Sequence, residues 1–534
     1  MEKTLLEVMV MKRNSLESRR YIYDALYGII HLPDFIWKVI SSTELQHLRE
    51  VRLCDINSLC LTGGANINRY EHAIGTCYLA IECVRNWPQQ NPISKKEKKQ
   101  IVLAALLHDV ANPAFGHSIE HVESKDGFEH EKSFENLIFG RKTESYQYRS
   151  ATLEPIYFGM FKDLATKESK ENLRAIGKII EGEGKFGPLI NGTMDLDNID
   201  NVFRLAYHIG IIKLGEVPLN LARSLWIENG DLVIKENAVS YVEEWFKVRK
   251  KLYSFLLLNP EEFSGKCMLR EASELAKTKQ KHAFNWFDVD YELLKRLSEM
   301  PLVREEEKDY LFTIDTQFRR ELNNRILSEN LLNEFQKNEH GLSNKASVAP
   351  WENGWKIYDK SNYYVKSWRN ELRVYKLVIT GVRISEIVQR LMKGELYGCI
   401  GIFSTERVEK AEIFRNVNDR KDLEDELSSK IRKKFGGRFK NAKIRFHPII
   451  DVNKTERQVD IRTDSGRNLS IGKPSRRLLI GTFFRNPHLN MHKIKPALET
   501  VRQIRKEIQT YLSDYLEDAM LQEVELYAEA EQDK

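Results

Sequence analysis

The sequence predicts a mainly α protein with a smaller α+β lobe at its C-terminal end. Helical spacing of apolar residues dominates the first part of the chain, a turn-rich stretch covers Asn338–Gly354, and β-rich runs follow residue 395. A chain of 534 residues also exceeds the usual size of a single hydrophobic core. We therefore expect three regions: a helical core over 1–337, a helical connection over 338–394 and an α+β lobe over 395–534.

The helical core is predicted from several apolar segments. Gln100–His108 is short and apolar, and the helix breakers Asn112-Pro113 follow it. Asp197–Ile212 opens with acidic residues, which suit the positive end of a helix dipole. The other segments expected to be helical are Asn68–Trp87, Val239–Leu258 and Glu292–Lys337.

The C-terminal lobe is predicted from alternating β-rich and helical runs. The expected strands are Leu396–Phe403, Lys443–Val452, Gln458–Arg462 and Arg477–Phe484. The expected helices are Lys421–Phe435 and Ile494–Leu516.

Composition narrows the class of protein. An apolar content of 42% and a charged content of 30% are typical of a globular chain, and a net charge of +5 permits an anionic partner. No apolar run approaches the roughly 18 residues of a membrane span, and the N-terminus lacks the pattern of a secretory signal. We expect a cytoplasmic protein without membrane contact. The six cysteines contain no C-x-x-C pair and are expected to be reduced, buried thiols.

A set of histidines and aspartates at predicted helix ends indicates a metal site. His108-Asp109 ends one apolar helix, His72 lies near the start of another, and the acidic run Asp195–Asp200 begins a third. About one His-Asp pair is expected by chance in such a chain, so the joint pattern carries the argument. Two imidazoles and two carboxylates would leave coordination positions open for water and phosphate oxygens. We expect Mn, Fe or Mg, with Ni, Co or Zn as alternatives.

Four motifs in this region resemble those of a known family. Asn68–His72 is similar to an Asn-Arg-aromatic-Glu-His motif, and Asn112–Glu120 follows His108-Asp109 as in the bacterial dGTPases. Phe128–Glu131 resembles a later His-Glu motif, and Asp195–Asp200 matches D-x-D-x-x-D. Residues 20–280 thus resemble the HD phosphohydrolase superfamily, in particular the dNTP triphosphohydrolase branch of SAM-and-HD-domain enzymes and bacterial dGTPases. The resemblance implies an HD-domain helical core.

The resemblance also implies roles for individual residues. The metal ligands would be His72, His108, Asp109 and Asp197. The catalytic histidine would be His117, with Glu120 orienting it, and their i, i+3 spacing places both on one face if a helix starts there. The substrate contacts would be Arg69, His130, Arg249 and Asp200. Three of these residues have an alternative. His130 could be a solvated histidine and Arg249 part of a solvated helix face. Asp200 could support the metal ligands or cap the helix.

The expected activity is hydrolysis of (deoxy)nucleoside triphosphates to nucleoside and tripolyphosphate. Asn201 and Leu205 replace a tyrosine and an aspartate that read the sugar in the SAM-and-HD enzymes, so the nucleotide stays open. One alternative is an HD phosphatase or phosphodiesterase acting on another nucleotide.

Another alternative is a nucleotide- or nucleic-acid-responsive binding module. The basic stretch Lys430–Arg445 could bind an allosteric nucleotide or single-stranded nucleic acid, or could be a solubilising helix face. A homo-oligomer is implied by the resemblance alone.

Overall fold

The computed structural model describes most of the chain: residues 20–54, 66–116, 118–119, 130–139, 167–277, 288–300, 304–313, 347–351, 354–358, 363–368, 371–439, 442–485 and 498–524. The chain forms two compact units. The first comprises Met1–Leu294 together with Arg390–Lys534, and the second comprises Lys295–Gln389.

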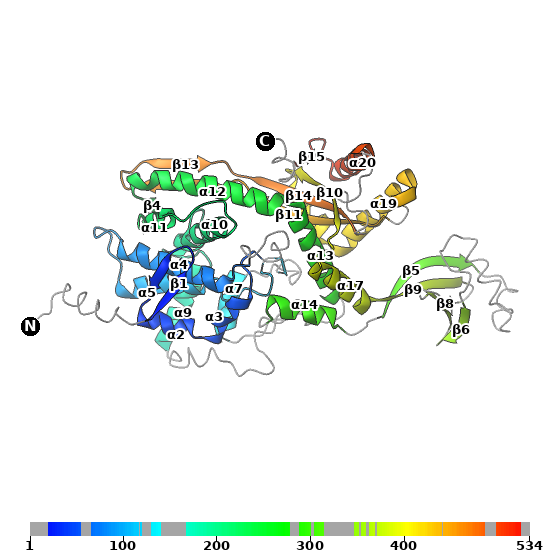
Figure 1. Ribbon diagram of the computed structural model, residues 1–534, viewed down its shortest axis with the longest axis horizontal. Coiled ribbons are helices and arrows are strands. Elements are labelled where there is room, and N and C mark those ends of the chain that lie inside the picture. Colours follow the sequence, from blue (N-terminus) through cyan, green and yellow to red (C-terminus); the bar gives the residue numbers. More distant parts are fainter. Residues whose placement is uncertain are drawn as a thin grey trace, which may run out of the picture. The chain divides into compact units, whose positions relative to one another are not determined.

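The first unit begins with a small hairpin, β1 (Tyr21–Asp24) and β2 (Gly28–His31), followed by a helical body (Figure 1). The helices of this body are α2 (Asp34–Ile40), α3 (Thr43–His47), α4 (Arg69–Arg85), α5 (Lys95–Leu107), α7 (His130–Phe139), α9 (Lys167–Ile180), α10 (Leu196–His208), α11 (Val217–Ala222), α12 (Val239–Leu258), α13 (Pro260–Lys277) and α14 (Asp290–Ser298). Helix α4 packs against both α5 and α10, and α10 packs against α12. The predicted helical core is therefore present, and α12 has the bounds expected from the sequence.

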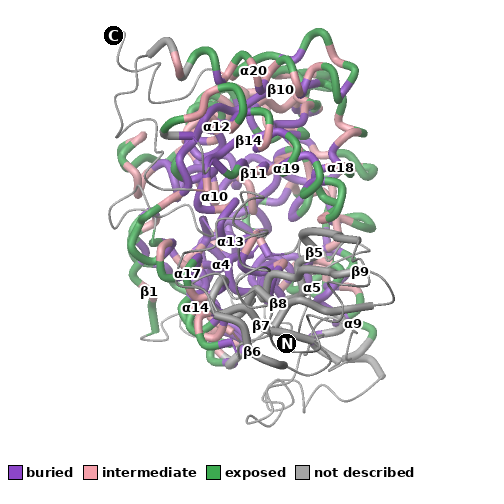
Figure 2. The backbone as a smooth tube through the Cα atoms, turned by 90° about the vertical axis from the view of Figure 1, so that its right-hand side faces the viewer, coloured by how far each residue is buried: buried purple, intermediate pink, exposed green. Residues whose placement is uncertain are grey.

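The central helices begin at residues that satisfy their free N–H groups. The side chain of Asn68 accepts from Glu71 N at the start of α4, and Asp195 accepts from Asn198 N at the start of α10. Helix α5 begins with a complete capping box between Ser94 and Glu97. Helix α4 is buried on nearly every face (Figure 2), as its apolar pattern predicts. These caps fix where the first turns of α4 and α10 lie.

A four-stranded mixed sheet joins the helical body to the C-terminal lobe. Its order is β13-β12-β4-β3, formed by β3 (Leu225–Glu228), β4 (Asp231–Ile234), β12 (Gln458–Thr463) and β13 (Asn468–Gly472). Strands β4 and β12 pair in parallel, with Arg462 opposite Val233. The β3–β4 hairpin was not predicted, although its turn, Asn229-Gly230, is a strong hairpin signal and both residues have positive φ.

The C-terminal lobe contains a second sheet of order β11-β14-β10-β15. Its strands are β10 (Gly398–Thr405), β11 (Ile444–Val452), β14 (Arg476–Phe484) and β15 (Gln522–Glu523), and the accompanying helices are α18 (Ala411–Arg415), α19 (Val417–Phe435) and α20 (Leu498–Leu516). Apolar residues of these strands and helices form one buried cluster, and α13 also packs against β10, β11 and β14. The predicted α+β lobe is confirmed.

The second unit is a five-stranded antiparallel sheet of order β5-β9-β8-β7-β6. The strands are β5 (Arg304–Thr313), β6 (Ser347–Trp351), β7 (Gly354–Tyr358), β8 (Tyr363–Trp368) and β9 (Glu371–Ile379), and α17 (Thr380–Met392) follows them. The described residues of 338–394 form strands instead of the expected helical connection, except at α17. The helix expected over Glu292–Lys337 ends with α14, and the described residues that follow form β5. Aromatic and β-branched residues favour strands in β8 and β9, whereas β5 opens with six charged residues and carries no regular apolar pattern.

Two expectations from composition concern the whole chain. The described helices are all too short or too polar to cross a membrane. The five described cysteines, Cys54, Cys77, Cys83, Cys267 and Cys399, are buried and form no disulfide with one another, as predicted for reduced thiols, and Cys60 lies outside the described residues.

Candidate metal centre

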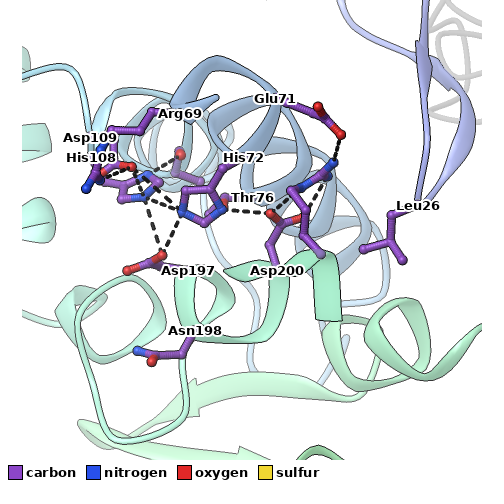
Figure 3. Close-up of polar contacts among 12 residues, drawn as sticks. Leu26, Arg69, Glu71, His72, Thr76, His108, Asp109, Asp197, Asn198 and Asp200 are labelled. Atoms are coloured by element: carbon purple, nitrogen blue, oxygen red, sulfur yellow. Dashed lines mark hydrogen bonds and ion pairs between the residues drawn. The ribbon is translucent and has the colours of Figure 1, made fainter. Parts of the chain in front are cut away.

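Three helices of the first unit bring four predicted metal ligands together. His72 lies in the first turn of α4, and His108 is the C-cap of α5, followed directly by Asp109. Asp197 lies in the first turn of α10. The Nε2 atoms of His72 and His108 are 3.1 Å apart, and Asp197 Oδ1 lies 2.8 Å from the first and 3.5 Å from the second (Figure 3). Asp109 Oδ2 lies 3.9 Å and 3.8 Å from the same two nitrogens.

The other nitrogen of each imidazole is bound to an acceptor outside the cluster. His72 Nδ1 lies 2.7 Å from Asp200 Oδ2, and His108 Nδ1 lies 2.9 Å from the carbonyl oxygen of Ala105. Because each Nδ1 donates a proton outward, each Nε2 is oriented toward the cluster as a metal-ligating imidazole requires. His72, His108 and Asp109 lie close enough together to hold a metal ion, and Asp197 Oδ1 lies beside both imidazoles. Imidazole nitrogens with carboxylate oxygens form a donor set that fits a divalent cation.

Burial and charge explain the electrostatics of these groups. Burial alone would lower the pKa of His72, but hydrogen bonds to Asp197 and Asp200 outweigh it and raise that pKa to about 10. Burial would raise the pKa of Asp109, but the Arg69 guanidinium and the neighbouring histidines hold it well below its usual range. The metal-free centre therefore holds a proton on His72 at the point where a cation would bind.

Metal affinity is expected to rise with pH, because the cation has to displace this proton. The pKa of His72 in the folded protein is about 10, above the ordinary value of 6.5. The proton on His72 therefore stabilises the metal-free fold fully below pH 6.5, and this stabilisation is lost as the pH rises through about 10. The affinity for Mn²⁺ should increase about tenfold per pH unit over this window, for one proton released. Calorimetric titration with Mn²⁺ in buffers of different ionisation enthalpy measures both the affinity and the number of protons released. An affinity independent of pH, with no proton release, would contradict the assignment.

Two further predicted residues contact Asp109, one of the four predicted ligands. Arg69 Nη1 donates to Asp109 Oδ2 at 2.9 Å, and His130 Nε2 lies 3.6 Å from Asp109 Oδ1. Asn112 Nδ2 donates to Asp109 Oδ1 at 2.6 Å. Arg69 and His130 are both buried, so the alternative of a solvated His130 is not supported. The structure thus places these two residues beside the cluster and in contact with one of its carboxylates.

Asp200 lies behind His72 and holds its ring in place. Its carboxylate accepts from Arg204 and from the hydroxyl of Tyr27, at 2.8 Å in each case, as well as facing His72 Nδ1. Arg204 Nη1 also donates to Asp24 and Glu71, at 2.9 Å and 2.8 Å. Asp200 is fully buried within these contacts. Its position is that of a residue supporting a ligand, which was the alternative to substrate contact.

Asp24 belongs to the same network of charges, although none of the sequence motifs contains it. It lies in the hairpin before the helical body, 180 residues from its partner Arg204. Tyr27, in the turn of the same hairpin, lies outside the four motifs as well. Gly75 allows the close approach of these groups, because a Cβ atom there would clash with both Arg204 and Asp200.

Arg249 is buried and held by the C-terminal lobe. Its Nη1 and Nη2 donate to the carbonyl oxygens of Lys454 and Asn453, at 2.7 Å and 2.9 Å, in the loop after β11. Its guanidinium carbon lies 4.3 Å from the centre of the Tyr253 ring. Burial lowers the pKa of Arg249 to about 10. The alternative of a solvated helix face is therefore not supported. In the same loop, Arg457 donates to Thr193 O at 2.8 Å, close to the start of α10.

The predicted catalytic pair, His117 and Glu120, lies outside the described residues. The turn before His117 is described: Phe115 and Gly116 both have positive φ, and Phe115 N donates to Asp290 Oδ1 at 2.8 Å. A buried phenylalanine in this conformation is costly unless its surroundings fix it, and the bond to Asp290 does so.

The cations of the basic stretch Lys430–Arg445 are largely paired where their side chains are described. Lys430 lies 3.0 Å from Glu426, Lys434 pairs with Glu507, and Arg445 lies 3.2 Å from Glu424. Arg432 donates to a backbone carbonyl. Lys440 and the side chain of Arg438 are outside the described residues. These pairings favour the structural alternative for this stretch over a nucleic-acid site.

The chain is similar to proteins of known sequence. Residues 69–177 match the family described as HD domain. The chain is 26% identical over 274 residues to the uncharacterized protein YwfO of Bacillus subtilis, which covers 50% of this chain and 58% of YwfO. It is 24% identical over 442 residues to the uncharacterized protein MJ1154 of Methanocaldococcus jannaschii, covering 77% and 86%.

A third relative carries a functional name. The chain is 29% identical over 209 residues to the deoxynucleoside triphosphate triphosphohydrolase SAMHD1 homolog of Dictyostelium discoideum, covering 37% of this chain and 38% of that protein. The chain thus spans a little over half of YwfO and a smaller part of the SAMHD1 homolog.

Proposed function

Because this chain carries an HD domain and has relatives among the deoxynucleoside triphosphate triphosphohydrolases, we propose that it is a metal-dependent hydrolase of (deoxy)nucleoside triphosphates. The products would be nucleoside and tripolyphosphate. The observation that carries the proposal is the convergence of His72 Nε2, His108 Nε2 and carboxylate oxygens of Asp109 and Asp197 on one point.

The residues around this point have distinct proposed roles. When bound, the divalent cation would polarise a phosphate oxygen and make a water ligand more acidic. Asp200 keeps the His72 ring oriented, and Arg69 fixes the carboxylate of Asp109. Arg249, held rigidly by two carbonyl oxygens, offers a fixed positive charge for the phosphate tail.

We assign the proton transfer to His117, oriented by Glu120. Protonated His117 would donate to the departing 5′-oxygen as water attacks the α-phosphorus in line. The P–O5′ bond breaks, the electron pair goes to O5′, and the proton from His117 completes the nucleoside hydroxyl. His117→Ala should keep the bound metal and lose about 10²- to 10⁴-fold in turnover, the usual contribution of a general acid.

The substrate is proposed as a class. Leu205 is buried and Asn201 lies near it on α10, in the places where the SAM-and-HD enzymes read the sugar. These replacements remove polar groups that recognise deoxyribose, so base and sugar preference do not follow from the resemblance. The same replacements are compatible with a phosphatase or phosphodiesterase reaction at this centre.

The test is incubation of the Mn²⁺-loaded full chain with each of the eight ribo- and deoxyribonucleoside triphosphates, followed by chromatography of the products. Tripolyphosphate and nucleoside in equal amounts support the proposal. Release of orthophosphate alone would indicate a phosphatase. No turnover combined with tight binding of single-stranded polynucleotide would indicate a binding module. Wild-type turnover by His117→Ala would remove that residue from the mechanism.

A further inference from the structure

A cavity in the first unit is lined by several cationic side chains and by none of the four proposed ligands. It has a volume of about 140 Å³ and is bounded by α13, by the α18–α19 turn, by β11 and by the loop that follows β11. Five cationic side chains line it: Lys266, Arg270, Arg415, Arg420 and Lys454.

One carboxylate accompanies these five cations in the lining. Glu274 pairs with both Arg270, at 3.6 Å, and Arg420. Arg270 and Arg420 are buried, and burial together with the charge of Arg420 lowers the pKa of Arg270. Within the part of the chain that the structure describes, neither Lys266 nor Arg415 has a carboxylate partner. The cavity therefore carries an excess of positive charge.

The cavity adjoins residues of the proposed active site. The backbone carbonyl of Lys454 accepts from Arg249 Nη1 at 2.7 Å, while the Lys454 side chain lines the cavity. Leu257, two turns after Arg249 on α12, and Ser118, directly after His117, also line it. A ligand that moved Lys454 would therefore act on the hydrogen bond that holds Arg249.

We propose that this cavity binds a phosphate or short polyphosphate group. Clustered lysine and arginine side chains recognise phosphate through charge-assisted hydrogen bonds. A volume of about 140 Å³ is below the roughly 300 Å³ of sites that enclose an entire drug-sized ligand. It suits phosphoryl groups and excludes a fully enclosed nucleoside. The anion is either a free effector or the far phosphate of a substrate whose other end lies at the metal centre.

Phosphate binding at this cavity does not depend on the proposed hydrolysis. Whether the bound phosphate belongs to an effector or to a substrate can be decided only if the proposed hydrolysis occurs. The experiment uses the full chain stripped of metal, titrated calorimetrically with orthophosphate, pyrophosphate and tripolyphosphate at physiological ionic strength. The test variant is Lys266→Gln with Arg415→Gln, which removes two cations that pair with no described carboxylate. The matched control is Lys96→Gln with Arg476→Gln, which makes the same change in net charge at exposed positions outside the lining.

We expect saturable binding by the wild type and the control, and a dissociation constant at least tenfold higher for the test variant. No saturable binding by the wild type, or equal affinity of the test variant and the wild type, would overturn the proposal. If nucleotides are hydrolysed, an effector changes kcat when free tripolyphosphate is added, and the test variant loses this response. A substrate phosphate instead makes the variant's KM rise with kcat unchanged. If no nucleotide is hydrolysed, the binding result still decides the proposal.

Discussion

Replacing Asp197 by alanine is expected to remove the bound metal and to lower nucleotide hydrolysis by on the order of 10³-fold or more, since several kcal/mol of charge stabilisation depend on the cation. Asp197 Oδ1 lies closest to His72 Nε2 and also reaches His108. Its side chain is 31% exposed, whereas those of the other three ligands are almost fully buried. Removing Asp197 should therefore disturb the fold less than removing Asp109, whose loss would break a buried ion pair with Arg69.

Metal content by mass spectrometry and turnover of the Mn²⁺-loaded protein measure this effect. Asp231→Ala is the matched control, because Asp231 is an exposed carboxylate at the start of β4. The control should keep full metal content and the wild-type rate. An Asp197→Ala protein with stoichiometric metal and undiminished turnover would show that the centre has been misassigned.

Replacing Arg204 by methionine is expected to destabilise the protein by about 3–5 kcal/mol, the usual cost of removing one partner of a buried ion pair. Arg204 is fully buried and donates to Asp200, Asp24 and Glu71. Asp24 and Asp200 are also almost completely buried. Without the guanidinium, Asp24 and Asp200 lose the positive charge that they share, and Asp200 is held less firmly behind His72. Denaturant unfolding of the metal-free protein measures the change in free energy.

Arg223→Met serves as the control for this substitution. Arg223 also pairs with a carboxylate, that of Glu82, but its side chain is 39% exposed and Glu82 keeps a second partner in Arg85. Exposed ion pairs contribute about 0–1 kcal/mol, so this variant should unfold near the wild-type denaturant concentration. Equal losses in the two variants would mean that burial of the Arg204 network is not what stabilises it.

The four proposed ligands could be predicted because local signals place them. His72 and Asp197 follow helix caps at Asn68 and Asp195, and His108 ends an apolar helix before a Pro-containing turn. Helix starts and ends can be recognised within a few residues of sequence. Strands β10, β11, β12 and β14 could also be predicted from local signals, since β10 and β14 are mostly apolar and β12 alternates apolar and polar residues.

The remaining features depend on partners that are distant in the sequence. Tyr27 meets Asp200 across 173 residues, and Arg249 meets the carbonyl of Lys454 across 205. Every residue has a backbone carbonyl, so the sequence cannot show which one a side chain will meet. Arg249 could therefore be assigned only to a phosphate contact or to a solvated helix face. The strands of the second unit were missed because β5 and β6 lack a regular alternation of apolar and polar residues.

The parallel pairing of β4 with β12 also determines the order in which the protein can be completed during synthesis. Arg462 of β12 contacts Glu228 of β3, 234 residues earlier in the chain. When the helical body leaves the ribosome, the edge of β4 has no neighbour, and α13 has no sheet to cover its apolar face. Such an edge can pair with other chains until it is covered. The nascent chain therefore carries an open strand edge until β12 emerges, and expression at low temperature or with chaperones should increase the yield of correctly folded protein.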